Sequence, residues 1–287
     1  MKPSVFENAI KKSHYTDFSK SRNTIWSWIG LLFHAKLKNL RTKVLPRVDK
    51  KLPHVHFKHQ SILIPSYERL EPYELQIKEA EIKYLVTKLN GLVIKPNAIF
   101  SFWKNIGYKN KLFKTPSNFA SQKIKGTTPA VSQVTNLLYW IVLHSQLEIV
   151  ERYRHNYDLY PDDLRKRPFG TGATCIHNQY DLKFQNKTDS IFQIIMTYQN
   201  GVLYGELRSL TLPLLIYEVF EERHLIKKNS FNEYIRHNAV YRSIKNTKTQ
   251  KTRVEYVTEN HALMVYEPLE DHDVTDIKDL KAGDITL

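Results

Sequence analysis

The fold of this chain is decided by one stretch, Gly126-Thr127-Thr128-Pro129-Ala130-Val131-Ser132-Gln133-Val134-Thr135-Asn136-Leu137-Leu138-Tyr139-Trp140-Ile141-Val142-Leu143. The residues before Ser132 form an irregular run. After Ser132, apolar residues recur at positions 134, 137, 138, 141 and 142, which is the spacing that lines one face of a helix. The pattern predicts a helix that begins at Ser132.

Ser132 therefore has two interpretations. Unpaired backbone N–H groups and the positive end of the helix dipole meet in the first turn of a helix. A serine at this place is suited either to capping the helix or to acting as a reactive group that becomes anionic. The residues around Ser132 leave both interpretations open.

A second helix is predicted upstream, in residues 72–89. Its apolar residues follow helical spacing, and Asn90-Gly91 after it is typical of a left-handed helix end. The same pattern predicts that Glu74, Lys78 and Glu81 face solvent.

The second half of the chain is rich in strand patterns. Asn200-Gly201 lies between two alternating runs, which is the strongest short signal for a hairpin. Strands are predicted at 92–94, 98–103, 214–222, 241–245, 253–259 and 262–266. The sequence thus predicts an α+β fold in which a mostly antiparallel sheet packs against two or three helices, with a basic N-terminal helical arm.

The net charge of +14 is concentrated near the N-terminus. The first sixty residues hold 13 Lys and Arg against three acidic residues, whereas the C-terminal end is acidic. We therefore divide the chain into a basic arm, a central domain and an acidic tail. The boundaries are 1–60 for the arm, 61–266 for the domain, with a motif core at 126–189 and a strand-rich part at 190–266, and 267–287 for the tail.

The arm also has two interpretations. Its apolar run at 25–33 is too short to span a bilayer, which needs about twenty residues, and it lacks the features of a signal peptide. Trp26 and Trp28, followed by a basic run, suit peripheral binding of residues 1–51 to an anionic membrane. The same residues suit an amphipathic helix that packs on the domain with a solvated basic face. No nucleic-acid-binding motif accompanies the charge, so nucleic acid is not an expected partner.

Several blocks of the sequence resemble the VanW family. They are Leu89-Asn90-Gly91-Leu92-Val93-Ile94-Lys95-Pro96, Phe100-Ser101-Phe102-Trp103, Ser132-Gln133-Val134-Thr135-Asn136-Leu137-Leu138-Tyr139-Trp140, Glu151-Arg152-Tyr153-Arg154-His155, Pro168-Phe169-Gly170-Thr171-Gly172-Ala173-Thr174, and Asp181-Leu182 with Asn186-Lys187-Thr188. The resemblance covers roughly residues 67–210, about half of the chain. It implies a link to cell-wall (peptidoglycan) metabolism or glycopeptide resistance.

The chain departs from the family pattern at Ser132. Members usually carry Gly-Gly-Gly-x-Cys-Gln here, and in some of them the cysteine looks like the nucleophile of an L,D-transpeptidase. This chain has Thr128-Pro129-Ala130-Val131-Ser132-Gln133 instead. A thiol near a helix start can ionise at neutral pH, whereas a serine needs a general base in order to attack. The resemblance implies an L,D-transpeptidase-like acyl transferase that uses Ser132, and the substitution favours a degenerate site. The alternative is a non-catalytic protein that binds a peptide or glycan, or that associates with a membrane.

The resemblance also implies partners for Ser132. His155 is the candidate base, and Asp158 is the nearest acid able to orient its imidazole, with Asp181 in reserve. For a lone histidine, the plain alternative is an ordinary hydrogen-bonded residue.

Candidate substrate contacts lie in the same motifs. They are Gln133, Arg152, Gly170, Gly172 and Asp181. Arg152 suits bidentate binding of a carboxylate, and its plain alternative is a salt bridge to Glu148. The amides of Gly170-Thr171-Gly172 suit an oxyanion, with a tight turn as the alternative.

No metal or other cofactor is expected. Cys175 is the single cysteine and is predicted to be a buried structural thiol. His54, His56 and His59 lie in a Pro-interrupted basic segment without a nearby carboxylate, which indicates a solvated loop rather than a metal site. The expected partner is a peptidoglycan stem peptide or a cell-wall precursor. The expected location is cytoplasmic and peripheral at the inner face of the membrane.

Overall fold

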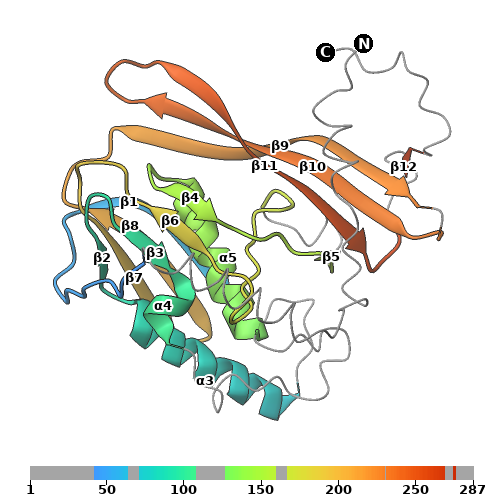
Figure 1. Ribbon diagram of the computed structural model, residues 1–287, viewed down its shortest axis with the longest axis horizontal. Coiled ribbons are helices and arrows are strands. Elements are labelled where there is room, and N and C mark those ends of the chain that lie inside the picture. The colour runs from blue at the N-terminus through green and yellow to red at the C-terminus, as the bar shows by residue number, and fades with distance from the viewer. Residues whose placement is uncertain are drawn as a thin grey trace, which may run out of the picture. The chain divides into compact units, whose positions relative to one another are not determined.

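The computed structural model describes residues 42–63, 71–107, 127–159, 167–229, 231–268 and 274–275 (Figure 1). These residues are rich in strands, as the sequence predicts, and the strands form three sheets rather than one. The first forty-one residues of the predicted arm and most of the acidic tail lie outside the described residues.

The first sheet has four strands, each antiparallel to its neighbours. Their order is β1 (His54–Ile62), β8 (Val202–Ser209), β7 (Phe192–Gln199) and β2 (Leu92–Ile94). The predicted hairpin is confirmed, because Gln199 pairs with Val202 and the two residues between them have positive φ angles, 51° at Asn200 and 74° at Gly201. Positive φ at both positions gives the turn a twist that matches its strands.

β1 differs from two expectations. It crosses the boundary placed at residue 60, and Leu45 before it is part of the hydrophobic core. His54, His56 and His59 lie in this strand, so the expectation of a solvated loop is wrong. Alternation of histidine with Val55 and Phe57 hides a strand pattern, because imidazole can pack on either side of a sheet.

The second sheet is built on three long antiparallel strands. They are β9 (Leu215–Lys228), β10 (Tyr234–Asn246) and β11 (Thr252–Met264), and the short β12 (Val274–Thr275) and β5 (Tyr157–Asp158) join its edges in parallel. The two strands predicted at 253–259 and 262–266 are one strand. Asn260 and His261 interrupt the apolar pattern without breaking the strand, because they pair with Asn238 and His237 of β10.

The third sheet is small and leads into the motif segments. β6 (Lys183–Gln185) lies between β3 (Ile99–Ser101) and β4 (Glu148–Glu151). Phe100 and Phe184 are fully buried, and their rings stack with centroids 4.3 Å apart. β4 runs directly into residues 152–155.

The helix predicted at 72–89 is confirmed as α3 (Pro72–Leu89), and Gly91 after it has a φ of 81°. However, Glu74, Lys78 and Glu81 are only 8%, 6% and 2% exposed, so the prediction that they face solvent is wrong. α3 is covered on this side as well as on its apolar side, and the Glu81 carboxyl reaches Thr128 at the start of α5. α4 (Phe102–Ile106) is a short helix directly after β3.

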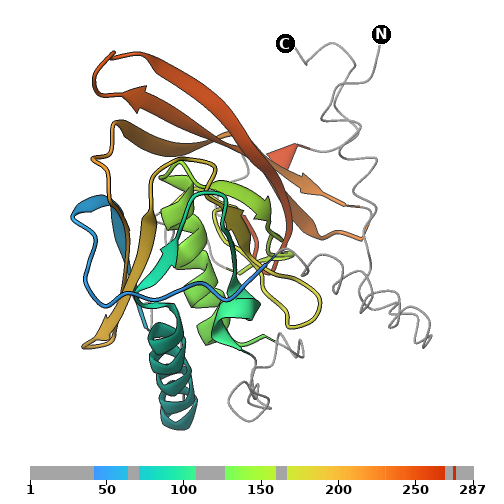
Figure 2. The same cartoon turned by 60° about the vertical axis from the view of Figure 1, so that its left-hand side comes forward.

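α5 (Pro129–Leu143) is the central helix, and Figure 2 shows it between the first sheet and the long strands of the second. Its buried residues include all of the run from Leu137 to Leu143, so it is covered on more than the single face that its spacing predicts. Gly205 of β8 permits this close packing, because a Cβ there would lie 2.6 Å from the Ile141 side chain. On the other side, Arg242 of β10 donates to the carbonyl groups of Leu143 and Ser145 at the end of the helix.

Candidate functional site

The start of α5 places Ser132 inside the helix rather than at its cap. Thr128 is the N-cap, and its hydroxyl accepts a hydrogen bond from Val131 N at 3.2 Å. Pro129 takes the first helical position, which needs no N–H group. Ser132 N donates to Thr128 O at 3.0 Å, so the first helical hydrogen bond already uses this amide. The capping role belongs to Thr128, and the hydroxyl of Ser132, which is partly exposed, has no hydrogen bond to another residue of the described ranges.

His155 bonds to two neutral side chains. Its Nε2 lies 2.8 Å from Asn136 Oδ1, and its Nδ1 lies 2.8 Å from Thr174 Oγ1. Asn136 Oδ1 also accepts from Ala173 N at 2.8 Å, so this atom is an acceptor and Nε2 carries the ring proton. Nδ1 then accepts from the Thr174 hydroxyl, whose other acceptor, Arg154 O, is farther away at 3.1 Å.

Burial, together with the nearby positive charge of Arg152, lowers the pKa of His155 to about 4. The ring is therefore neutral at pH 7 with both nitrogens occupied. Gly172 lies directly against it, because a Cβ on Gly172 would stand 2.7 Å from both Asn136 Oδ1 and His155 Nε2. The glycine is needed here for close packing.

Arg152 holds the loop that contains Gly170 and Gly172. Its Nε donates to Gly172 O at 2.8 Å and its Nη2 donates to Gly170 O. Both Nη atoms also donate to Asn260 Oδ1 of β11, each at 3.1 Å, and the guanidinium lies 4.9 Å from the ring of Tyr139 on α5. These contacts use the donors of Arg152 that a substrate carboxylate would need.

The sequence offered two plain alternatives here: a salt bridge between Arg152 and Glu148, and a tight turn at Gly170-Thr171-Gly172. Glu148 pairs with Lys187 at 2.6 Å and not with Arg152. Gly170 has a φ of 82°, and a Cβ on it would lie 1.9 Å from the amide nitrogen of Asn260. The loop is thus a tight turn pressed against β11, and its carbonyl groups, not its amides, face Arg152.

Asp158 lies in β5 and is bonded away from His155. Its Oδ2 lies 2.7 Å from Arg236 Nε and accepts from Tyr266 Oη at 2.6 Å. Arg236 also contacts His224 Nε2. This buried group ties the edge strand β5 to β10 within the second sheet, and the structure does not bring Asp158 together with Ser132.

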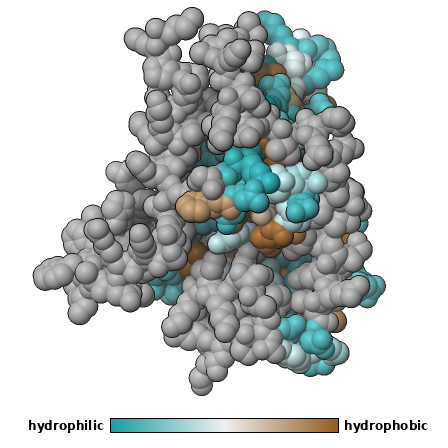
Figure 3. Space-filling model, turned by 90° about the vertical axis from the view of Figure 1, so that its right-hand side faces the viewer, coloured by the Kyte–Doolittle hydropathy of each residue, from teal (hydrophilic) through white to brown (hydrophobic). Residues whose placement is uncertain are grey.

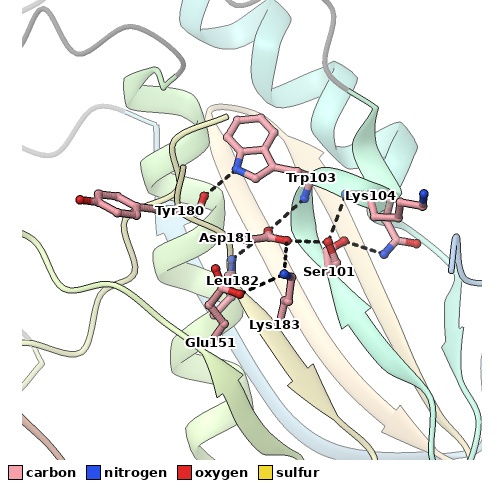
Figure 4. A network of polar contacts seen from close by, with 9 residues as sticks. Ser101, Trp103, Lys104, Glu151, Tyr180, Asp181, Leu182 and Lys183 are labelled. Atoms are coloured by element: carbon pink, nitrogen blue, oxygen red, sulfur yellow. Dashed lines mark hydrogen bonds and ion pairs between the residues drawn. The ribbon is translucent and has the colours of Figure 1, made fainter. Parts of the chain in front are cut away.

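Asp181 lies in a separate network at the start of β6, drawn in Figure 4. Its Oδ2 accepts from Ser101 Oγ at 2.6 Å, and its Oδ1 accepts from Leu182 N at 2.9 Å and from Trp103 N at 3.2 Å. Lys183 Nζ lies 3.9 Å from Asp181 Oδ2. Burial raises the pKa of Asp181, and the bonds to Ser101 and Trp103 oppose this rise. The network joins β3, α4 and β6, so Asp181 has a structural role in this arrangement.

Comparison with known proteins identifies the family of the region that contains these residues. Residues 78–208 match the family described as VanW like protein. This region belongs to the VanW family. The chain is also 28% identical over 176 residues to the Vancomycin B-type resistance protein VanW of Enterococcus faecalis, and this alignment covers 60% of the chain and 63% of that protein's length. No solved structure matches the chain.

The VanW region contains every candidate site residue and ends before the three long strands of the second sheet. Of the candidates, Arg152, Gly170 and Gly172 lie together around His155, whereas Asp158 and Asp181 belong to other networks. Cys175 is fully buried, and burial and the negative charge of Asp181 raise the pKa of its thiol, which agrees with the predicted structural role.

Two residues near the start of α5 have features that the sequence did not reveal. Gln133 Nε2 donates to Ser61 Oγ at 2.9 Å and to Ile62 O at 2.8 Å, which ties the helix to the end of β1. Glu81 is buried beside Thr128, and burial raises its pKa to about 7. Its helical position four residues before Leu85 gave no signal of this, because the residues that cover it come from distant parts of the chain.

Two features are absent from the described part of the chain. Among the described residues, no group of three His, Cys, Asp or Glu side chains is placed to hold a metal ion. No helix in the described ranges is long and apolar enough to cross a membrane.

Proposed function

We propose that this protein is a VanW-like component of glycopeptide resistance or cell-wall metabolism, and that it binds a peptidoglycan stem peptide or a cell-wall precursor at a degenerate acyl-transfer site. The matched VanW region and the similarity to a vancomycin resistance protein support the biological setting. The chain spans 63% of the length of that relative, so its activity and its partners are part of the proposal.

The hydrogen bonds of His155 are the observation that supports a degenerate rather than an active site. A general base must offer an unprotonated nitrogen within hydrogen-bond reach of the nucleophile. In His155, Nε2 points its proton at Asn136 and Nδ1 accepts from Thr174, so neither nitrogen is open to Ser132. A pKa of about 4 also makes the ring a weak base. Ser132 is left without activation, and the site is suited to binding rather than to bond making.

The test is the intact mass of the protein after incubation with a tetrapeptide-stem muropeptide donor. We compare the wild type with Ser132→Cys and Ser132→Ala. The wild type and Ser132→Ala are expected to stay unmodified, whereas Ser132→Cys forms an acyl adduct, because a thiol in the first turns of a helix ionises more readily. An adduct on the wild type that is absent from Ser132→Ala would overturn the proposal.

Cys175 provides an internal control for this test. It is fully buried and its pKa is raised, so a thiol reagent is expected to leave it unmodified in the folded wild type. Labelling of Ser132→Cys therefore reports on the new thiol alone. Calorimetric titration with the muropeptide then checks binding, which should occur in the wild type even though no adduct forms.

A place at the inner face of the membrane is a further part of the proposal. The basic arm supports it, because Lys and Arg next to paired tryptophans favour anionic lipid. Deletion of residues 1–40 is the suitable test, since Leu45 belongs to the core and must be kept. Full-length protein should sediment with anionic vesicles and the deletion variant should not; equal sedimentation would exclude this role for the arm.

A further inference from the structure

His237 and His261 face each other in the second sheet, beyond the end of the VanW match. They are directly opposite in the pairing of β10 with β11, and their ring centroids are 4.7 Å apart. The two Nδ1 atoms are in hydrogen-bond contact, so one of them carries a proton and the other accepts it.

Two cationic side chains flank this pair from either side. Lys227 of β9 pairs with Ile235, two residues before His237, so both side chains lie on the same face of the sheet. Arg154 belongs to a segment that runs beside β11, because Arg152 donates to Asn260 and Leu263 N donates to Asn156 O at 3.0 Å. Arg154 lies between those two contacts and therefore comes next to His261.

Neither cation has an ion-pair partner in the part of the chain that the structure describes. No hydrogen bond or ion pair joins the side chain of Arg154 or Lys227 to another residue within the described ranges, although both are partly buried. The negative charge of Glu259 opposes the lowering of the Arg154 pKa by burial, but Glu259 forms no ion pair with Arg154. The contrast with Arg236, which has Asp158 at 2.7 Å in the same sheet, is clear.

The charges act on both imidazoles. Burial, together with His261, Lys227 and Arg154, lowers the pKa of His237 to about 3. Burial, with Arg154 and Lys227, lowers the pKa of His261 to about 4. The cluster therefore holds two cationic side chains, and the one acidic group that acts on Arg154, Glu259, forms no ion pair with it among the described residues.

We propose that Arg154, Lys227, His237 and His261 form a binding site for the diphosphate group of a nucleoside diphosphate or a lipid diphosphate. A planar guanidinium, an ammonium and imidazole N–H groups are the donors that bind phosphate oxygens. A diphosphate also matches the charge of the cluster. Two cations and two rings that can be protonated carry more positive charge than the single negative charge of a carboxylate ligand would neutralise. Figure 3 looks onto the side of the molecule that lies to the right in Figure 1, and in the middle of its coloured surface hydrophilic residues lie beside hydrophobic ones.

The choice of source rests on the proposed function, since cell-wall precursors carry sugars and peptides on a diphosphate. The anion site itself does not depend on that function. It is formed mainly by residues outside the VanW match, which ends at residue 208.

The first experiment is calorimetric titration of the full chain with inorganic diphosphate at low salt. Arg154→Gln and Lys227→Gln should each weaken binding at least tenfold. Lys228→Gln is the matched control, because this neighbouring lysine lies over the Tyr234 ring at 5.0 Å, and its affinity should be unchanged. Thermal unfolding confirms that each variant is folded. Absence of binding to the wild type, or equal binding by all variants, overturns the proposal.

The second experiment measures proton uptake. A bound anion raises the pKa of both histidines from their low values, so binding takes up protons and the affinity rises as the pH falls from 8 toward 5. Sulfate, which does not titrate in this range, separates uptake by the protein from that by the ligand. Titration in two buffers of different ionisation enthalpy should show uptake in the wild type and less in His237→Gln; no uptake would exclude the histidines from the site.

The last comparison identifies the source of the diphosphate. UDP and vesicles that contain a prenyl diphosphate are titrated against wild type and Lys227→Gln. Tighter binding of either one than of inorganic phosphate, lost in Lys227→Gln, supports the proposal and names the source. No preference for either over inorganic phosphate overturns the assignment to a diphosphate. Because no stem peptide is used, failure here is distinct from failure of the muropeptide test.

Discussion

His155, His237 and His261 are all histidines whose pKa is lowered by burial, but their partners differ. His155 bonds to Asn136 and Thr174, so each of its nitrogens has a neutral partner. His237 and His261 bond to each other and lie near two cations, Arg154 and Lys227, that form no ion pair within the described part of the chain. A histidine in a family motif can thus be a packing element, while the histidines for which we propose ligand binding lie outside the motif.

The largest effect on the free energy of unfolding is expected where a buried ion pair of the second sheet is broken. Arg236 and Asp158 are an almost fully buried ion pair, with side chains 2% and 1% exposed. Arg236→Met leaves the carboxylate buried without its cation and should lower the free energy of unfolding by about 3–5 kcal/mol. Lys227→Met removes a cation that has no carboxylate partner and should change it by less than about 1 kcal/mol. Urea denaturation measures both variants, and equal losses would remove the distinction between balanced and unbalanced charge.

The VanW region also contains a buried acidic side chain, Glu81, which forms no ion pair among the described residues. Burial raises the pKa of this carboxyl from 4.5 to about 7, so the folded state binds the proton more tightly than the unfolded chain does. The contribution of Glu81 to stability is therefore greatest below about pH 4.5 and is lost as the pH rises through 7.

Glu81→Gln removes this dependence. The variant should become more stable relative to wild type as the pH rises, by up to roughly 3 kcal/mol at pH 8, since each pKa unit corresponds to about 1.4 kcal/mol. Urea denaturation between pH 4 and 8 measures the difference. Glu79→Gln is the matched control, because Glu79 is on the same helix but pairs with Lys83 near the surface. A difference between Glu81→Gln and wild type that stays constant with pH would show that Glu81 titrates normally.

Local patterns were enough to predict some elements of the fold, but not the histidine-rich part of β1 or the helix α4, which begins inside the strand predicted at 98–103. The bounds of α3 and the Asn200-Gly201 hairpin follow from spacing and turn chemistry, because both depend on neighbours in the sequence. The burial of Glu81 and the continuity of β11 depend on partners from distant segments, which a single sequence does not place. The same limit applies to the candidate site. The structure places Arg152 beside His155, but Asp158 was selected by its nearness in sequence, and its partner Arg236 is 78 residues away.

The smallest effect on stability is expected at Thr174. A substitution there distinguishes two reasons why His155 is a weak base. Thr174→Val removes the hydroxyl that donates to Nδ1, which should lower the free energy of unfolding by about 1 kcal/mol. The donor favours the neutral ring, so its loss should raise the pKa of His155 from about 4. Burial and Arg152 remain, so the pKa should stay below its ordinary value of about 6.5. The Nδ1 chemical shift, followed by NMR against pH, measures this change, and Thr174→Ser keeps the donor as a control.

The same variant then tests whether the hydrogen bond or the burial disables the site. Incubated with the muropeptide donor, Thr174→Val should still form no adduct, because a freed nitrogen with a low pKa remains a weak base for a serine. An adduct that disappears when Ser132→Ala is added would mean that the Thr174 hydroxyl alone holds the base inactive. The chain would then be one substitution from acyl transfer. Without such an adduct, the loss of reactivity lies in the buried ring and in Ser132 itself, and only a more acidic nucleophile at that position restores it.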